Sequence, residues 1–241
     1  MPSISPAIVQ SFAPTGTLRA AINLGNPVLV QGTAAAPTGV TVDLATELAK
    51  RLGVPLKLVP FAQAGGVFEA LQQGLWDIAF LAIEPKRAAE IDFTAPYVII
   101  EGVYVVPKES KLQTVEEVDS KGVRISVITN AAYDLFLTRS LKNAELVRSP
   151  EAGFAQFERE KLDVIAGVKQ PMVAYAARTP GVRVIPGRFM EIRQAMGTPK
   201  GRDAAAAYLR GFVEEMKASG FVGDSLKRGG QGDATVAPAE K

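Results

Sequence analysis

The chain contains no cysteine and no histidine among its 241 residues, and it has a single tryptophan. These absences exclude disulfide bonds, zinc sites built from Cys or His, cysteine nucleophiles and any Ser-His-Asp relay. Carboxylates alone could still bind a metal, but the sequence has no Asp- and Glu-rich loop of the calcium-binding type. The sequence therefore predicts neither a metal ion nor another cofactor.

An excess of charge of one sign is also lacking. Lys and Arg number 27 against 25 Asp and Glu, which leaves a formal net charge of +2. The two signs are interspersed, so no basic face is expected to follow phosphates, and nucleic-acid binding is not expected. Hydrophobic residues make up 47% of the chain, which suits a globular protein of one large or two ordinary domains.

Long hydrophobic runs are absent as well. No segment approaches the roughly 18 apolar residues that a membrane-spanning helix needs. Residues 1–6 have neither the basic region nor the apolar stretch of a secretory signal peptide. Either a signal segment has been removed or the protein stays inside the cell, and the sequence leaves both open.

Strand and helix patterns alternate along the chain, and such alternation predicts a parallel sheet with right-handed crossovers. The expected strands are 18–23, 56–59, 78–80, 98–106, 123–128, 145–147, 164–166, 182–185 and 191–196. The expected helices are 41–52, 67–73, 131–141, 151–160, 171–177 and 203–219. The polar tail from Gly229 is expected to be loose.

One interval occurs twice. Phe68 precedes Asp77 by the same number of residues as Phe154 precedes Asp163, with a helix between them in both cases. This echo is consistent with two similar lobes, although any helix–turn–strand unit can look like this.

The most informative stretch runs from Asp77 to Tyr97. After a short buried strand, Glu84-Pro85 opens a helical turn that carries Arg87, and proline suits the first helical position. An arginine beside free N–H groups at the positive end of a helix can hold an anion. The alternative is a surface arginine paired with Glu84 or Glu90 at helical spacing.

With Asp92-Phe93-Thr94-Ala95-Pro96-Tyr97 at its end, this stretch resembles the signature of the family 3 extracellular solute-binding proteins, the amino-acid-type receptors of ABC importers. The segments 39–45 and 74–77 also match the family, and the likeness covers roughly residues 16 to 220. It implies the α/β fold of the type II periplasmic binding proteins. In that fold two similar lobes, each a mainly parallel sheet flanked by helices, are joined by two hinge strands.

The resemblance implies lobe 1 at residues 1–101 plus 191–241 and lobe 2 at 102–190. It further implies a monomeric, periplasmic, non-enzymatic protein whose cleft closes by a hinge motion over a small carboxylate-bearing ligand, an amino acid or an organic anion. The expected protein partner is an ABC permease. In the family the arginine that matches Arg87 binds the ligand's carboxylate.

Other site residues also follow from the resemblance. The family usually has glycine and hydroxyl residues at the start of the second-lobe helix, where Asn130, Ala131 and Tyr133 lie here, so that only backbone N–H groups and the helix dipole remain for a ligand. A side-chain N-cap by Thr129 or Asn130 is expected there. The remaining candidates are placed at carboxyl ends of strands, where open parallel sheets bind ligands: Asn23, Asn26, Phe61 and Ala82.

Lys169 departs from the family, which typically has an aspartate there to pair with the ligand's ammonium. A buried cation cannot receive an ammonium. Two hypotheses follow: the ligand has two acidic groups, for Arg87 and Lys169, or its ammonium meets Glu101. Lys169 as a solvated surface residue is the third alternative.

Two other functions remain open. Cyclohexadienyl dehydratases resemble these binding proteins, and Glu101 or Glu84 would be the general acid if burial raised its pKa. A ligand sensor inside the cell is the other alternative, because no signal peptide is visible.

Overall fold

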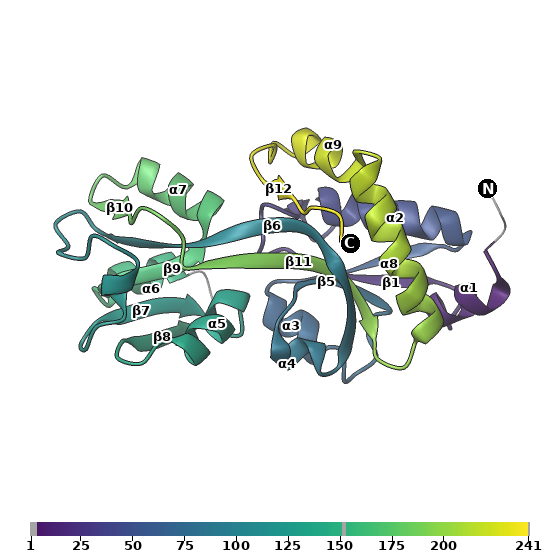
Figure 1. Ribbon diagram of the computed structural model, residues 1–241, viewed down its shortest axis with the longest axis horizontal. Helices are drawn as coiled ribbons and strands as arrows, with labels where there is room; N and C mark the ends of the chain where they lie inside the picture. Colours follow the sequence, from purple (N-terminus) through teal and green to yellow (C-terminus); the bar gives the residue numbers. More distant parts are fainter. Residues whose placement is uncertain (1–3, 151–152, 241) are drawn as a thin grey trace. The chain divides into compact units, whose positions relative to one another are not determined.

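The computed structural model describes residues 4–150 and 153–240 (Figure 1). The chain divides into two compact units, unit 1 with Met1–Ile99 and Arg193–Lys241, and unit 2 with Ile100–Ile192. It crosses between them twice, in β6 (Ile91–Pro107) and in β11 (Met190–Pro199). The boundaries expected from the sequence lie two residues inside unit 2 at both crossings.

Unit 1 is built on a mainly parallel sheet. Its strands are β4 (Leu56–Phe61), β1 (Leu18–Asn23) and β5 (Ile78–Ala82), all parallel, followed by the antiparallel β11. Helices α2 (Val40–Leu52) and α3 (Ala64–Glu69) both contact β1 and lie on opposite faces of the sheet (Figure 1). The central strands are therefore buried on both faces, which explains their continuous apolar sequence.

The other helices of unit 1 are α1 (Pro6–Phe12), α4 (Pro85–Ala88), α8 (Asp203–Ala218) and α9 (Phe221–Arg228). A small hairpin is formed by β2 (Gln31–Thr33) and β3 (Ala36–Thr38). The sequence did not predict α1, α9 or the hairpin. Within the described residues, no helix is long and apolar enough to cross a membrane.

The expectation of a loose C-terminal tail is wrong for its described part. Strand β12 (Thr235–Val236) pairs with β6 at Val98 and Ile99, and the N–H of Ala237 donates to the carbonyl of Tyr97 at 3.1 Å. Ala237 is 3% exposed. The tail supplies hydrogen-bond partners for the backbone groups of β6. A local hydrophobicity pattern does not reveal this pairing, because β6 is distant in the sequence.

Unit 2 repeats the architecture of unit 1. The parallel strands β8 (Glu145–Ser149), β7 (Arg124–Ile128) and β9 (Val164–Val168) follow the same order as β4, β1 and β5. Next to β9 lies the antiparallel β6, which also pairs with β10 (Val182–Val184). The helices are α5 (Ala132–Ser140), α6 (Gly153–Arg159) and α7 (Lys169–Arg178), with a short 3-10 turn at Glu116–Val118.

Three element boundaries differ from expectation. Strand β6 begins at Ile91, so the motif from Asp92 to Tyr97 lies inside it. Helix α7 begins at Lys169, two residues earlier than expected, and α3 lies three residues earlier at its start. The first two residues of the helix expected at 151–160 lie outside the described residues.

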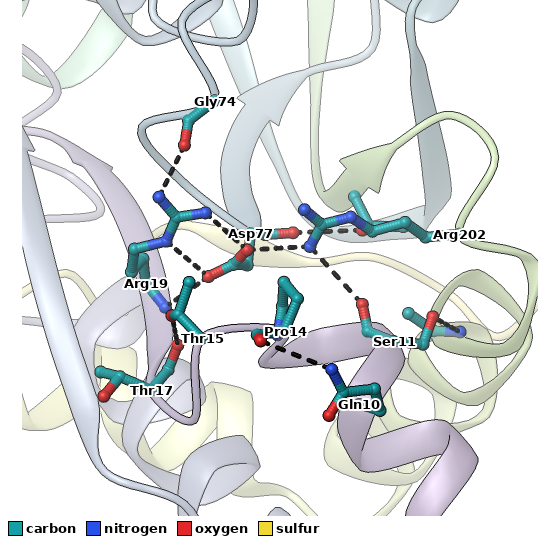
Figure 2. A network of polar contacts seen from close by, with 11 residues as sticks. Gln10, Ser11, Pro14, Thr15, Thr17, Arg19, Gly74, Asp77 and Arg202 are labelled. Atoms are coloured by element: carbon teal, nitrogen blue, oxygen red, sulfur yellow. Dashed lines mark hydrogen bonds and ion pairs between the residues drawn. The ribbon is translucent and has the colours of Figure 1, made fainter.

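A buried carboxylate ties several elements of unit 1 together (Figure 2). Asp77, just before β5, accepts hydrogen bonds from the backbone N–H and the guanidinium of Arg19 on β1, at 2.8 to 3.0 Å. Arg202, the N-cap residue of α8, donates to the same carboxylate at 2.9 Å. The side chain of Asp77 is fully buried.

Candidate functional site

Arg87 lies in the interior on helix α4 (Pro85–Ala88), which follows β5 after two intervening residues. It is 1% exposed, and its Nη1 donates to the carbonyl of Ala82 at 3.1 Å. Burial lowers the pKa of Arg87 to about 10, and the nearby charge of Glu84, itself 3% exposed, opposes this shift. The surface position in that alternative is therefore wrong, although Glu84, one of the partners it named, is buried close enough for its charge to act on Arg87. A buried guanidinium is a strong donor to an anion.

Three strand ends of unit 1 bring other predicted residues to the same edge of its sheet. Asn23 and Phe61 are partners in the register of β1 and β4, and Ala82 is the last residue of β5. The side-chain oxygen of Asn23 accepts the N–H of Gly25 at 3.0 Å, and that of Asn26 accepts the N–H of Val28 at 3.3 Å. Both asparagines thus shape the turn after β1.

Unit 2 has its predicted turn at the end of β7. Asn130 has a φ of 60°, one of two positive values outside glycine in the described chain. The N-cap of α5 is Ala131, with no side-chain cap, so the expected capping by Thr129 or Asn130 is wrong. The N–H of Asn130 instead donates to the carboxylate of Asp134 at 2.8 Å, because Asp134 reaches back from the first turn.

The backbone donors of this turn are partly used inside unit 2. The N–H of Ala131 donates to the carbonyl of Ile128 at 3.1 Å, and the first helical bond runs from Leu135 to Ala131 at 3.0 Å. The N–H groups between these two, on Ala132, Tyr133 and Asp134, belong to the first turn of α5. Tyr133 is 7% exposed, and burial raises the pKa of its phenol, so its ring belongs to the core.

Asp134 is a site-shaping residue that sequence reasoning missed. The residue is 2% exposed, and its carboxylate accepts hydrogen bonds from Arg148 at 2.9 Å and Thr138 at 3.3 Å, besides that from Asn130. Its place three positions after Ala131 is the available signal, since an acidic residue there commonly bonds back to the helix start.

Glu101 and Lys169, the subjects of two separate hypotheses, contact each other. Lys169 Nζ lies 2.6 Å from Glu101 Oε2, and Arg188 Nη1 lies 2.9 Å from Glu101 Oε1. Hydrogen bonds from Lys169 and Arg188 lower the pKa of Glu101. The side chain of Lys169 is 50% exposed, so the premise of a buried cation is wrong. Sequence reasoning missed Arg188, 87 residues from Glu101 along the chain.

The candidate residues of both units are hydrogen-bond donors and charged groups, which suit the binding of a small polar ligand. Over residues 4–150 and 153–240, no cluster of carboxylates is arranged to hold a metal ion. Unit 1 offers a buried guanidinium at the carboxyl ends of parallel strands, the usual place for ligands in such sheets. Unit 2 offers a turn with first-turn N–H groups and a partly exposed group of ion pairs.

The sequence profile of the bacterial extracellular solute-binding proteins, family 3, matches residues 18–228. The chain belongs to this family. The fold expected from the resemblance is thereby confirmed, and it is shared with AbpA, an amino acid ABC transporter substrate-binding protein from Streptococcus pneumoniae whose structure contains L-arginine. The two agree with a TM-score of 0.76 at 18% identity, over 91% of this chain and 97% of that one.

Two curated relatives are similar over part of their length. The L-cystine-binding protein TcyJ of Escherichia coli (strain K12) is 27% identical over 151 residues, 57% of this chain and 56% of TcyJ. The cyclohexadienyl dehydratase of Pseudomonas aeruginosa is 28% identical over 118 residues, 47% of this chain and 43% of that enzyme. The chain thus spans about half the length of the curated relatives it matches.

Proposed function

We propose that this protein is the receptor of an ABC importer and binds a small ligand with a carboxylate, an amino acid or an organic anion. The permease, a monomeric state and a periplasmic location are parts of the same proposal. The observation that carries it is the buried guanidinium of Arg87 at the carboxyl end of β5. Family membership, the L-cystine-binding protein TcyJ and the L-arginine bound in the structure of AbpA support it.

Arg87 suits a carboxylate for three physical reasons. Its guanidinium presents donors in a planar fork that matches two carboxylate oxygens. Its position on the short helix α4 is held by the hydrogen bond to Ala82, so little freedom is lost on binding. The lowered pKa records the cost of desolvating this cation, and an anionic ligand would recover part of that cost.

The test compares Arg87→Met with Lys86→Met, a neighbouring cation on α4 that is exposed. A thermal-shift screen of amino acids and organic acids on the wild-type protein identifies ligands, and calorimetry then gives their affinities. We expect Arg87→Met to weaken binding at least about tenfold, the scale of a hydrogen bond to a charged group. Lys86→Met should retain the affinity. Equal affinities for Arg87→Met and the wild-type protein would contradict the assignment of Arg87.

The contribution of unit 2 to binding stays a prediction. The candidates there are Asn130, Ala131, Tyr133, Glu101 and Lys169. Among them Tyr133 is the weakest, because its ring is buried in unit 2. Substitution of Asn130, Tyr133, Glu101 and Lys169 by alanine or by an isosteric residue, and of Ala131 by proline, which lacks the N–H, followed by titration with the ligand found above, ranks them.

Enzymatic dehydration is the second candidate function, since one relative is a cyclohexadienyl dehydratase. A general acid needs a pKa near the working pH. Hydrogen bonds from Lys169 and Arg188 lower the pKa of Glu101, which takes it further from neutral pH. This argues against Glu101 as the general acid. Incubation with prephenate or arogenate tests the activity, and product formation would replace the receptor proposal. Localisation of the gene product tests a sensor inside the cell.

A further inference from the structure

A cavity opens at the edge of the unit 2 sheet that lies opposite to the carboxyl ends of its parallel strands. It is lined by Val123 and Asp163, which directly precede β7 and β9, and by Pro107 at the end of the antiparallel β6. Its volume of about 650 Å³ suits a small molecule. The candidate ligand residues of unit 2 after β7 and β9 lie at the other edge of this sheet, so the cavity is separate from them.

The buried part of the cavity lining is apolar. Phe157 and Leu162 are 4% and 2% exposed. Leu112, Val123 and Val182 add half-buried aliphatic side chains to the same lining. Such a surface favours the apolar part of a ligand, because removal of apolar area from water stabilises the complex.

One wall of the cavity is the loop from Lys108 to Leu112, which Arg183 on β10 holds in place. The Arg183 guanidinium donates to the carbonyls of Ser110 at 3.1 Å and of Leu112 at 2.6 Å. Its Nε donates to the carbonyl of Lys108 at 3.3 Å, and the N–H of Lys108 donates to the carbonyl of Gly181 at 2.9 Å. These bonds fix the wall within unit 2, so ligand binding has little chain ordering to do.

Two of the three carboxylates that line the cavity are already engaged. Glu158 accepts the hydroxyl of Tyr175 at 2.7 Å. Asp163 accepts the backbone N–H of Arg124 at 2.9 Å and lies 3.8 Å from Nε of the same arginine. The third carboxylate, Glu109, is exposed and is the one that remains for a cation.

The cations outnumber this remaining carboxylate. Lys111 and Lys161 line the cavity, and Arg183 holds its wall. Within residues 4–150 and 153–240, none of these three cations forms an ion pair. A ligand with an anionic end would supply the countercharge, whereas an ammonium would face three cations and a single available carboxylate.

Lys161 occupies a backbone position that suits glycine. Its φ of 48° lies in the left-handed region, and Arg124 Nη2 donates to its carbonyl at 3.0 Å. The equivalent turn of unit 1 has Gly74, with a φ of 62°, and Arg19 Nη1 donates to the Gly74 carbonyl at 2.6 Å. A side chain strains this conformation, and such strain is characteristic of functional positions. Unit 2 thus keeps a lysine at the cavity where unit 1 has the relaxed residue.

We propose that this cavity is a second binding site, for a small organic anion with an aromatic or branched aliphatic body and one carboxylate, which Lys161 binds. The apolar lining takes up the body, and the carboxylate meets the lysine. The inference stands apart from the proposed function, because it uses residues of unit 2 alone, at the edge of the sheet away from the candidate ligand residues.

The probes are three molecules of one shape: 3-phenylpropanoate, 3-phenylpropanamide and 3-phenylpropylamine. Their ends are anionic, neutral and cationic at neutral pH. Two-dimensional NMR of the nitrogen-15-labelled protein follows each titration, since the backbone amides of Leu112 and Leu162 report on the cavity. The titrations are repeated in Arg87→Met, so that a carboxylate bound at Arg87 is not mistaken for one bound at the cavity.

We expect 3-phenylpropanoate to shift the cavity amides and to bind at least about twofold more tightly than the amide, with the amine weakest. Lys161→Asn should weaken 3-phenylpropanoate about two- to fivefold, the range of exposed ion pairs, and asparagine tolerates the left-handed backbone. The matched control is Lys142→Asn, which removes an exposed lysine of unit 2 outside the cavity lining and should retain the affinity. Lys161→Gly should melt no lower than the wild-type protein, because glycine relaxes the turn.

Four outcomes overturn the inference. They are unchanged cavity amides with 3-phenylpropanoate, an amide or amine that binds as tightly as the carboxylate, equal losses of affinity in Lys161→Asn and Lys142→Asn, and a lower melting temperature of Lys161→Gly. The last would assign Lys161 a structural role. Binding at Arg87 is judged by its own variant, so either proposal can fail while the other stands.

Discussion

Asp77 in unit 1 and Asp163 in unit 2 occupy equivalent places in their sheets. Each precedes the central strand, β5 or β9, and each carboxylate accepts the backbone N–H of an arginine near the start of the neighbouring strand, at 3.0 Å for Arg19 and 2.9 Å for Arg124. The N–H of each aspartate returns a bond to the carbonyl of the same arginine. The interval shared with Phe68 and Phe154 thus has a structural counterpart.

The two aspartates differ in what covers them. The side chain of Asp77 is fully buried and is contacted by the guanidinium groups of Arg19 and Arg202 (Figure 2). The side chain of Asp163 is 47% exposed and lies 3.8 Å from Arg124 Nε, while Arg124 Nη2 donates to two carbonyls of the preceding turn. The same backbone arrangement therefore carries an interior ion network in unit 1 and a solvated pair in unit 2.

Removal of the buried carboxylate should have the largest effect. We expect Asp77→Ala to lower the free energy of unfolding by about 3 kcal/mol, because two arginines and a backbone N–H lose their acceptor in the interior. Urea unfolding followed by circular dichroism measures it. A loss below that of the corresponding change in unit 2 would show that burial does not distinguish the two aspartates.

Removal of the second arginine should cost less. Arg202→Met leaves Asp77 paired with Arg19 but breaks the bond from α8 at 2.9 Å, and we expect a loss of about 2 kcal/mol. The control is Arg210→Met, at an exposed position of the same helix, which should be close to neutral. If the two variants unfold at the same urea concentration, Arg202 adds nothing to the network.

The contribution of Asp77 to the free energy of unfolding should decrease as the pH falls. Burial raises its pKa, but hydrogen bonds from Arg19 and Arg202 outweigh burial, and the net pKa lies below the ordinary value of 3.8. The stabilisation is therefore complete above about pH 4 and is lost as the pH falls through the folded-state pKa, at up to about 1.4 kcal/mol per pH unit. Asp77→Asn should reduce this slope in urea unfolding at a series of acidic pH values, and an unchanged slope would contradict it.

Removal of Asp163, the exposed counterpart of Asp77 in unit 2, should have the smallest effect on stability. We expect Asp163→Ala to lower the free energy of unfolding by less than about 1 kcal/mol, since solvent screens the pair and can replace the lost acceptor of the Arg124 N–H. The same urea experiment as for Asp77→Ala measures it. A loss similar to that of Asp77→Ala would show that the shared backbone bond, and not the covered guanidinium contacts, stabilises both units.

Local pattern predicted the regular elements well. Strand β1 has the expected bounds, and α2 begins one residue early, because a continuous apolar run and a helical periodicity depend only on neighbouring residues. The alternation predicted parallel strands, and the structure supplied their order β4–β1–β5. Strand β12 was missed because it forms by pairing with β6, which lies more than 130 residues away in the chain.

The candidate site was less predictable. Arg87 was predicted from its motif, but its burial depends on the packing around α4. The contact of Lys169 with Glu101 depends on the register that pairs Gly102 with Val168. The turn at Asn130 was located correctly and its capping was not, since Asp134 competes for the backbone N–H.

The sequence by itself determined the family, the alternation of strands and helices, and the chemical types at the strand ends, because these are properties of short segments and of residue identity. Only the tertiary structure decided which charges are buried and which pair with each other. Asp77 and Asp163 have the same local setting, yet their surroundings come from distant segments, α8 in one case and solvent in the other. Burial and pairing are sums over such contacts, and they fix the energy of a charge.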